Sequence, residues 1–477
     1  MIASDYCFNL GFTHWHFLGV FASLREPDVF HIRSRKDQKS SNWTNCFNPQ
    51  PQTLFSKKNF KDFLFILKGF ETLDLEIFDI VIIGAGPAGA TAAWHLLGHG
   101  LRIALVDKST FPRDKICGDA LSGNTLYELK KLEEKGLDLS FMQIKDLAFP
   151  VEGLSFFSPK GYRLDLFRDT DESDVHPKLK YPGFVSKRID FDNFLIAPLK
   201  KHPDCTVIEN CEVKQFDFTG EKVEISCGDR KIAASMVIAA DGANSILARE
   251  SWRKKIDRNH YSAGLRQYYS NVIFEGSRPL IELHFLPEIL PGYFWIFPLP
   301  DNKANIGIGM LASALQKREI NLKDELSRII QHPKFSARFQ HAEALESPKG
   351  FGLPLGSRKS KVSGDRFLLV GDAASLIDPF TGEGIGYAMC SGRLAAGYLL
   401  SHWGKSNFSC NKHFDDLLWQ KIGDEIQTAY SIQKLLRYPW LFDGIAKGAM
   451  ASQYLYKVLN QMVWFPTKRK RLLKPWL

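Results

Sequence analysis

Residues 78–109 read FDIVIIGAGPAGATAAWHLLGHGLRIALVDKS, and this stretch decides the fold class. The opening FDIVIIGAG is a short β-branched run of the kind that forms a buried parallel strand. The next segment is rich in Ala and Leu, which predicts a helix that closes at Gly100. The letters RIALVD predict a second strand, so the whole stretch is one βαβ unit.

The turn between this strand and helix carries the spacing GxGxxG. One glycine makes the tight turn, one lets a pyrophosphate approach the backbone, and one lets helix and strand pack closely. The helix N-terminus offers unpaired N–H groups to phosphate. Asp107 ends the second strand, where a ribose hydroxyl would lie. We therefore predict that a dinucleotide, either NAD or FAD, contacts Gly84, Gly86, Ala88, Gly89, Asp107 and Lys108.

Two later stretches favour FAD over NAD. VIAADGANS contains Asp241, and FLLVGDAASLIDPFTGEGIGYAM contains Asp372 before a glycine-rich turn. An acid at a strand end can bind a ribityl hydroxyl. A helix that starts near Glu383 would point its amides at the flavin ring and stabilise the anionic reduced form. The ordinary alternative for Asp372 is an N-cap or turn aspartate.

Both stretches resemble motifs of the FAD-dependent oxidoreductases with the p-hydroxybenzoate hydroxylase fold. The first is similar to their DG motif and the second to their second flavin-binding motif. The resemblance implies FAD as the cofactor, with contacts at Asp241, Gly371, Asp372, Gly384 and Ile385. It also implies cofactor contacts at Arg188 and Val213, for which a solvated arginine and a plain strand valine are the simple alternatives.

Two further segments point to the substrate. FPRDKICGDALS follows the second strand, and PGYFWIFPLPDNKANIGIGM spans residues 291–310. Together they resemble the geranylgeranyl reductase family, which carries a KxCG segment near the flavin and a YxWxFP segment along the substrate cavity. The resemblance covers residues 77–400. Its matches are Lys115, Cys117 and Gly118 beside the cofactor, Tyr293, Trp295, Phe297 and Pro298 beside the substrate, and the strand residues Asn305, Gly307 and Gly309. Arg113, just before these matches, is a further predicted cofactor contact.

One position departs from the family pattern. Asp119 stands where the family often has a second glycine after CG. The YxWxFP segment agrees with the pattern, because Tyr293, Trp295 and Phe297 alternate and would share one face of a strand. Such an aromatic wall suits a long apolar chain, and an ordinary sheet core is the alternative.

Cys117 and Tyr293 are the candidate catalytic side chains. The charged residues before Cys117 include Arg113 and Lys115, and nearby cations lower the pKa of a thiol. The alternative is a small residue that packs against the flavin. The proton donor is Cys117, Tyr293 or a bound water molecule.

The resemblance implies an FAD-dependent reductase that saturates carbon–carbon double bonds of a geranylgeranyl-type isoprenoid chain. NADPH or a small electron-transfer protein would reduce the flavin. One alternative is a monooxygenase or halogenase with an apolar substrate. Halogenases carry WxWxIP, whereas this chain reads YFWIFP. Another alternative is an electron carrier that uses FAD at a membrane surface.

We expect an α/β fold, α+β overall, in which a Rossmann-like FAD-binding domain is interleaved with an antiparallel-sheet substrate domain and followed by a helical C-terminus. The predicted parts are a poorly ordered extension at 1–75, an FAD-binding domain at 76–150, 185–255 and 350–405, a substrate domain at 151–184 and 256–349, and C-terminal helices with a basic tail at 406–477.

Composition limits the remaining partners. The eight cysteines show no CxxC pair and no zinc-ligand spacing, so we expect no metal site and a reducing, cytoplasmic setting. Net charge is +9 without a long basic run inside the globular part, which argues against nucleic acid. No apolar run reaches the length of about 20 residues that spans a bilayer. Residues 467–477 are basic with interleaved apolar residues, so we expect peripheral membrane contact there, with a frayed terminus as the alternative.

Overall fold

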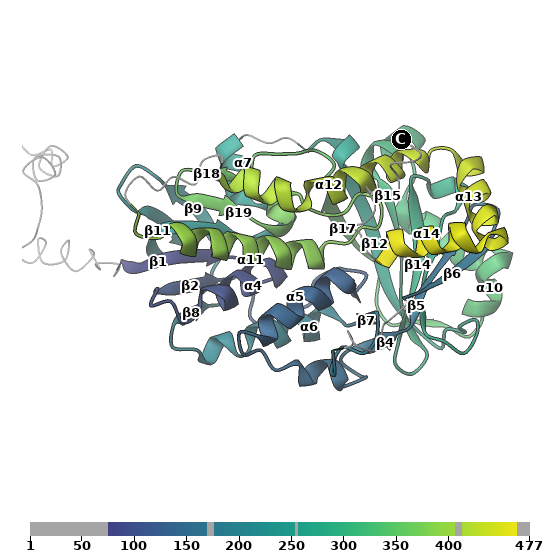
Figure 1. Cartoon of the computed structure of the whole chain (residues 1–477), viewed down its shortest axis with the longest axis horizontal. Helices are drawn as coiled ribbons and strands as arrows, with labels where there is room; N and C mark the ends of the chain where they lie inside the picture. Colours follow the sequence, from purple (N-terminus) through teal and green to yellow (C-terminus); the bar gives the residue numbers. More distant parts are fainter. Residues whose placement is uncertain (1–74, 169–175, 253–255, 406–412, 465–477) are drawn as a thin grey trace, which may run out of the picture. The chain divides into compact units, whose positions relative to one another are not determined.

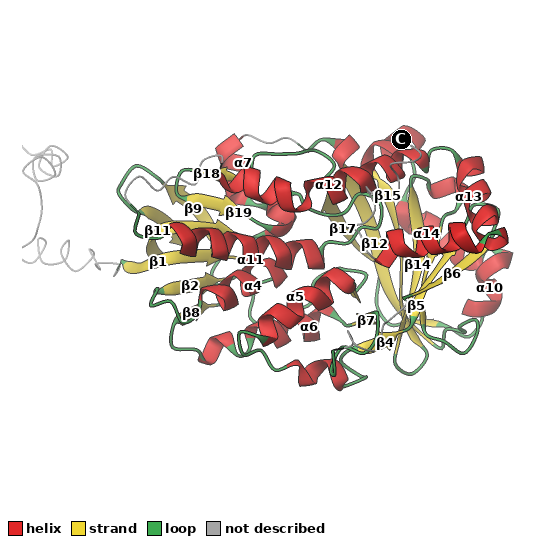
Figure 2. Cartoon of the chain, viewed as in Figure 1, coloured by secondary structure: helices red, strands yellow, loops and turns green. Residues whose placement is uncertain are grey.

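The computed structural model describes residues 75–168, 176–252, 256–405 and 413–464 (Figures 1 and 2). The predicted N-terminal extension lies outside these residues except for Leu75, and so does the basic tail at 467–477. Within the described part, the chain combines two large sheets, a small one and a helical C-terminal region (Figure 2).

The first large sheet has a parallel core, as the βαβ motif predicts. β1 pairs in parallel with both β2 and β11. On the outer sides of these strands, β8 pairs in parallel with β2, and β19 pairs in parallel with β11. A hairpin of β9 and β10 joins β11 in antiparallel fashion. The strands are β1 (Glu76–Ile83), β2 (Ile103–Val106), β8 (Cys205–Ile208), β9 (Val213–Asp217), β10 (Val223–Cys227), β11 (Arg230–Ala239), β18 (Ser363–Gly364) and β19 (Phe367–Leu369).

Helices cover this sheet. α4 already ends at Leu96, earlier than the Gly100 stop that the sequence predicts, because Gly98 and Gly100 both take positive φ angles. Figure 1 shows α11 beside α4, and the two helices are in contact. The helices are α4 (Pro87–Leu96), α5 (Gly123–Glu133), α6 (Arg188–Ile196), α7 (Ile246–Trp252) and α11 (Ile385–His402).

The second large sheet is antiparallel except where β5 lies parallel to β13. Its spatial order is β16-β12-β15-β14-β13-β5-β6, and β17 also pairs with β12. The strands are β5 (Gly153–Phe157), β6 (Arg163–Phe167), β12 (Tyr261–Ser270), β13 (Leu280–His284), β14 (Gly292–Leu299), β15 (Lys303–Leu311), β16 (Glu343–Ala344) and β17 (Lys349–Pro354). A separate small sheet contains β3 (Ala120–Leu121), β4 (Phe149–Val151) and β7 (Gly183–Val185).

The two faces of β14 enter different apolar cores, as its alternation predicts. Phe294 and Ile296 pack into a core that includes residues of α9 and α10. Trp295 and Phe297 belong to a second core, against which side chains of α13 and α14 pack. The outer helices are α8 (Ala312–Arg318), α9 (Leu322–Gln331), α10 (Pro333–Phe339), α12 (His413–Leu435), α13 (Pro439–Ala451) and α14 (Gln453–Trp464). Among the described residues, no helix is both long and apolar enough to span a bilayer.

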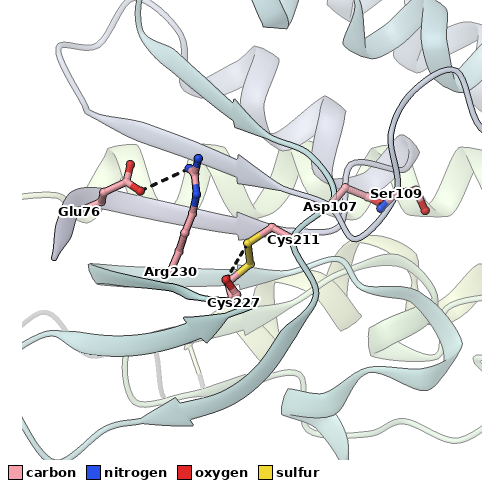
Figure 3. The surroundings of a disulfide bond; sticks show 6 residues. All are labelled: Glu76, Asp107, Ser109, Cys211, Cys227 and Arg230. Carbon is pink, nitrogen blue, oxygen red and sulfur yellow. Dashed lines mark hydrogen bonds and ion pairs between the residues drawn. A yellow bond between two sulfur atoms is a disulfide. The ribbon is translucent and has the colours of Figure 1, made fainter. Parts of the chain in front are cut away.

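The expected fold class is confirmed: a mixed α/β fold carries an antiparallel sheet and a helical C-terminus. The expectation of reduced cysteines is wrong for one pair, because Cys211 and Cys227 form a disulfide (Figure 3). The cause is the β9–β10 hairpin, whose pairing brings the two Cα atoms to 5.4 Å.

The contact between α4 and α11 gives a prediction for stability. A Cβ at Gly392 would lie 2.2 Å from the carbonyl oxygen of Ala88, so Gly392→Ala must push the helices apart. We expect a loss of about 1–3 kcal/mol in the free energy of unfolding, measured by denaturant titration. Gly397→Ala in the same helix is the control. No atom lies within 4 Å of the added Cβ there, so this change should stabilise the helix by up to about 1 kcal/mol. Equal effects of the two changes would contradict the packing argument.

Candidate active site

A cavity of about 1590 Å³ runs from the carboxyl ends of β1 and β2, past β14, to the C-terminal helices α13 and α14. A drug-sized ligand occupies a pocket of roughly 300–1,000 Å³, so this cavity has room for a large cofactor and a second molecule. Most of the predicted site residues line it: Gly84, Gly86, Ala88, Asp107, Lys108, Arg113, Cys117, Gly118, Arg188, Val213, Asp241, Asp372, Gly384, Ile385, Tyr293, Trp295 and Phe297. Gly89, Gly371 and Pro298 do not line it.

At the β1 end, the three glycines differ in surroundings. A Cβ on Gly84 would lie 2.3 Å from the carbonyl oxygen of Ala240, and one on Gly89 would lie 1.9 Å from that of Gly84. These two glycines therefore allow the turn and the packing of α4 on β1. A Cβ on Gly86 would meet only Arg113, at 3.7 Å. Gly86 is the N-cap of α4 without a side-chain cap, so the helix N-terminus faces open cavity.

Two carboxylates stand beside this turn. Asp107 accepts the N–H groups of Ala85 and Ser109, both at 2.8 Å, so its orientation is fixed. Asp241 accepts the N–H of Ile246 at 3.0 Å through one oxygen, and its Oδ1 is buried without a partner among the described residues. Burial raises the pKa of Asp241. A buried oxygen without a partner beside a cavity is an acceptor in position for a ligand hydroxyl.

Arg188 is not the solvated charge that the simple alternative describes. Its side chain is buried and holds Asp192 by two bonds of 2.6 and 2.7 Å. Arg113 donates to the same carboxylate at 2.7 Å. Burial alone would raise the pKa of Asp192, but the two guanidinium groups hold it below its usual value. The triad therefore presents net positive charge to the cavity.

At the end of the cavity near α11, the KxCG segment meets the stretch that contains Asp372. α11 begins at Ile385, two residues after the expected start at Glu383, and no side chain caps its N-terminus at Gly384. Asp372 pairs with Lys115 of the KxCG segment at 3.1 Å. An uncapped helix N-terminus here offers a partial positive charge to a ligand.

Side chains of β14 form an aromatic wall, here defined as Tyr293, Trp295 and Phe297, and each lies against a glycine. A Cβ on Gly307 would lie 2.0 Å from the Trp295 ring, and one on Gly118 would lie 2.9 Å from the Phe297 ring. The Tyr293 hydroxyl lies 3.0 Å from a Cβ built on Gly382 and donates to the carbonyl of Thr381.

Asp119 was not among the residues that the sequence singled out for the site. It has a φ of 69°, is fully buried and lines the cavity beside Cys117. Its Oδ2 accepts the Tyr268 hydroxyl at 2.5 Å and the Asn305 amide at 2.8 Å. Its Oδ1 is buried without a partner in the described part of the chain. The departure from the family pattern after CG was the only sequence signal for this residue.

Comparison with known proteins now decides the family. The family described as FAD binding domain matches residues 78–287, and the family described as geranylgeranyl reductase catalytic domain matches residues 269–350. Menaquinone reductase of Mycobacterium tuberculosis is 30% identical over 76% of this chain and 84% of its own. Digeranylgeranylglycerophospholipid reductase of Thermoplasma volcanium is 29% identical over 68% of this chain and 78% of its own.

The chain belongs to the geranylgeranyl reductase family of FAD-dependent oxidoreductases.

Solved structures agree on the fold of this family. A geranylgeranyl bacteriochlorophyll reductase-like protein of Thermoplasma acidophilum has a TM-score of 0.67 at 23% identity, covering 84% of this chain and 100% of its own. A flavin-dependent brominase has a TM-score of 0.64 at 18% identity, covering 84% of this chain and 99% of its own. At these identities the likeness shows the shared fold.

The cofactor of the reductase is FAD, and the residues present fit it. The open space at Gly86 leaves the N-terminus of α4 accessible to a pyrophosphate. The unpartnered oxygen of Asp241 is free for a hydroxyl of the cofactor. The uncapped N-terminus of α11 would stabilise negative charge on a reduced flavin ring.

Two acids of the cavity lining, Cys117 and Asp119, have shifted pKa values. Burial raises the pKa of the Cys117 thiol, and the smaller lowering by Arg188 and Lys115 does not offset it. The expectation of a lowered thiol pKa is therefore wrong, because desolvation outweighs the nearby cations. Burial raises the pKa of Asp119 to about 6, against smaller lowering effects of Tyr268 and Asn305.

Gly86 and Gly89 differ in the space around them, and this difference tests whether the N-terminus of α4 binds the pyrophosphate of FAD. A Cβ at Gly86 meets only the flexible end of Arg113, so we expect Gly86→Val to weaken FAD binding at least tenfold while the free energy of unfolding of the apo-protein changes by about 1 kcal/mol or less. Gly89→Val clashes with backbone and should cost about 3 kcal/mol or more. FAD titration by fluorescence and denaturant unfolding of the apo-protein measure the two effects. Normal FAD affinity of the Gly86 variant would refute this placement.

Proposed function

We propose that this reductase saturates carbon–carbon double bonds of an isoprenoid chain. The supporting observation is the apolar extension of the cavity. Beyond the aromatic wall, it continues past Leu436, in the turn after α12, and along side chains of α13 and α14: Phe442, Leu455, Leu459, Met462 and Val463. A substrate with a single aromatic ring has no use for so long an apolar path, whereas a chain of several isoprene units fills it.

The names of the relatives support an isoprenoid chain on a large head group. One relative is named as a menaquinone reductase and another as a digeranylgeranylglycerophospholipid reductase. We propose a geranylgeranyl-type lipid or isoprenoid quinone as the substrate. NADPH or a small electron-transfer protein is the proposed reductant.

The reaction adds a hydride to one carbon of the double bond and a proton to the other. Bound FAD, once reduced, supplies the hydride. Trp295 and Phe297 would hold the chain beside the flavin and exclude water. The indole of Trp295 is fixed by its hydrogen bond to Asn305 at 2.9 Å, so this part of the wall is rigid.

We assign the proton to Asp119. The Tyr293 hydroxyl already donates to the carbonyl of Thr381, and burial raises its pKa. Burial also raises the pKa of Cys117. Asp119 has a pKa of about 6 and an unpartnered oxygen. Its carboxyl group would give a proton to the substrate carbon, become a carboxylate, and take up a proton from solvent before the next turnover.

The first test is the product. We expect the protein, reduced chemically without oxygen and given geranylgeranyl diphosphate, to yield products that gain pairs of hydrogen atoms by mass spectrometry. Oxidised protein without reductant is the control. No hydrogenation without oxygen, but an added oxygen atom in air, would identify a monooxygenase. Flavin reduction without any change in the isoprenoid would favour an electron carrier.

The proton source predicts a pH dependence. Because Asp119 must be protonated, the rate of double-bond reduction should fall as pH rises above about 6. Asp119→Asn should lower the rate on the order of 100-fold and remove this dependence. Tyr268→Phe removes a hydrogen bond that favours the carboxylate, so it should move the profile to higher pH. The measurement is anaerobic single-turnover reoxidation of the reduced flavin by substrate.

The matched control is Asp138→Asn. Asp138 has an exposed carboxylate that binds Ser140 and Lys178 and does not line the cavity. Its variant should keep the rate and the pH profile of the parent protein. An Asp119→Asn variant with an unchanged profile would return the assignment to Cys117 or to a water molecule.

A further inference from the structure

The positive charge of this protein is concentrated in its last residues. Residues 434–477 contain nine lysines and arginines and a single acid, Asp443, so they carry a net charge of +8 out of +9 for the whole chain. Asp443 is buried and accepts bonds from the Ser158 hydroxyl at 2.6 Å and the Lys160 N–H at 2.9 Å. The charged side chains of this segment are therefore almost all cations.

Large apolar side chains are exposed on the same segment. Trp440 is 70% exposed, Tyr454 is 72% exposed and Met450 is 58% exposed. They come from α13 and α14, which pack against each other at the end of the molecule that also holds β6 (Figure 1). Tyr438 and Leu435, immediately before α13, are also more than a third exposed. Exposed apolar residues grouped in this way mark an interaction surface.

Part of this surface lies at an opening of the cavity. Leu435, Trp440 and Ile445 are exposed, and each also lines the cavity that begins at the flavin end. A residue that both contacts solvent and lines a cavity lies at its mouth. Trp440, one of the two most exposed aromatic side chains of the C-terminal helices, therefore lies at the mouth.

Basic residues stand within a few positions of the mouth residues in the sequence. The exposed lysines and arginine of this part are Lys434, Arg437, Lys447 and Lys457. None of these four forms an ion pair with another described residue. The sequence that follows Trp464 adds five more cations.

We propose that α13, α14 and the end of α12 dock on an anionic lipid bilayer, with the cavity mouth against the membrane. Trp and Tyr favour the interface between head groups and acyl chains, and lysines beside them attract anionic lipid. A second copy of this chain is a poor partner, because a symmetric contact would place these cations against themselves. The apolar side chains at the mouth would then meet acyl chains rather than water.

The test is flotation of the full-length, FAD-loaded protein with vesicles of phosphatidylcholine, with or without about 30% phosphatidylglycerol. We expect binding to the anionic vesicles that weakens as salt increases, because the Debye length shortens. The double variant Trp440→Ser, Tyr454→Ser should bind at least tenfold more weakly. The double variant Lys447→Gln, Lys457→Gln should lose about fivefold for each charge removed.

Matched controls change equally exposed residues elsewhere. Tyr127 is 53% exposed on α5, so Tyr127→Ser should leave binding unchanged. Lys317→Gln with Lys323→Gln serves the same purpose for charge, since both lysines are exposed. Thermal unfolding verifies that every variant is folded. The readout needs no isoprenoid substrate, so it is independent of the proposed reaction.

Three outcomes would overturn the proposal. The first is equal binding by the helix variants and the parent protein. The second is loss of all binding on deletion of residues 467–477 combined with no effect of the helix variants, which would assign the contact to the tail alone. The third is a dimer in solution that Trp440→Ser dissociates, which would make a second copy the occupant.

Discussion

The buried amide of Asn305 connects the two halves of the active site. Its oxygen accepts the indole N–H of Trp295 at 2.9 Å, and its nitrogen donates to the Cys117 carbonyl and to Asp119, both at 2.8 Å. The carbonyl and the –NH₂ group of one side chain thus bind the aromatic wall and the loop that carries Cys117 and Asp119. Without this amide, an indole N–H and a backbone carbonyl would be buried without partners, which costs about 1–3 kcal/mol for each group.

Two glycines leave the space in which rings of the aromatic wall lie. Gly307, two residues after Asn305, leaves the space in which the Trp295 ring lies across β15. Gly118, between Cys117 and Asp119, leaves the space for Phe297. The glycines at 118 and 307 are therefore a packing requirement, because each one makes room for a ring of the facing element. The chemistry of both segments depends on this fit.

Short sequence patterns predicted the elements whose structure depends mainly on neighbouring residues. The βαβ unit follows from residues 78–109, and the alternation along β14 correctly placed Trp295 and Phe297 on one face. Properties that depend on distant residues did not follow. The partners of Asp119, Tyr268 and Asn305, lie 149 and 186 residues along the chain. The pKa of Cys117 depends on burial, which its charged sequence neighbours do not reveal. The Arg188–Asp192 pair, at helical spacing, is the one ion pair of the site that sequence reasoning had the means to find.

The apolar wall and the acidity of Asp119 have one physical origin. The packing that excludes water from Trp295 and Phe297 also desolvates the carboxyl of Asp119 and raises its pKa. Further increase is opposed by the Tyr268 hydroxyl and by the buried cation Arg266, whose guanidinium stacks over the Tyr268 ring at 4.1 Å and pairs with Asp114 at 2.8 Å. The site therefore balances desolvation against the hydrogen bonds from Tyr268 and Asn305 and the positive charges of Arg266 and Arg188. Any change that lets water reach the wall would lower the pKa of the acid and, under the proposed function, weaken substrate binding as well.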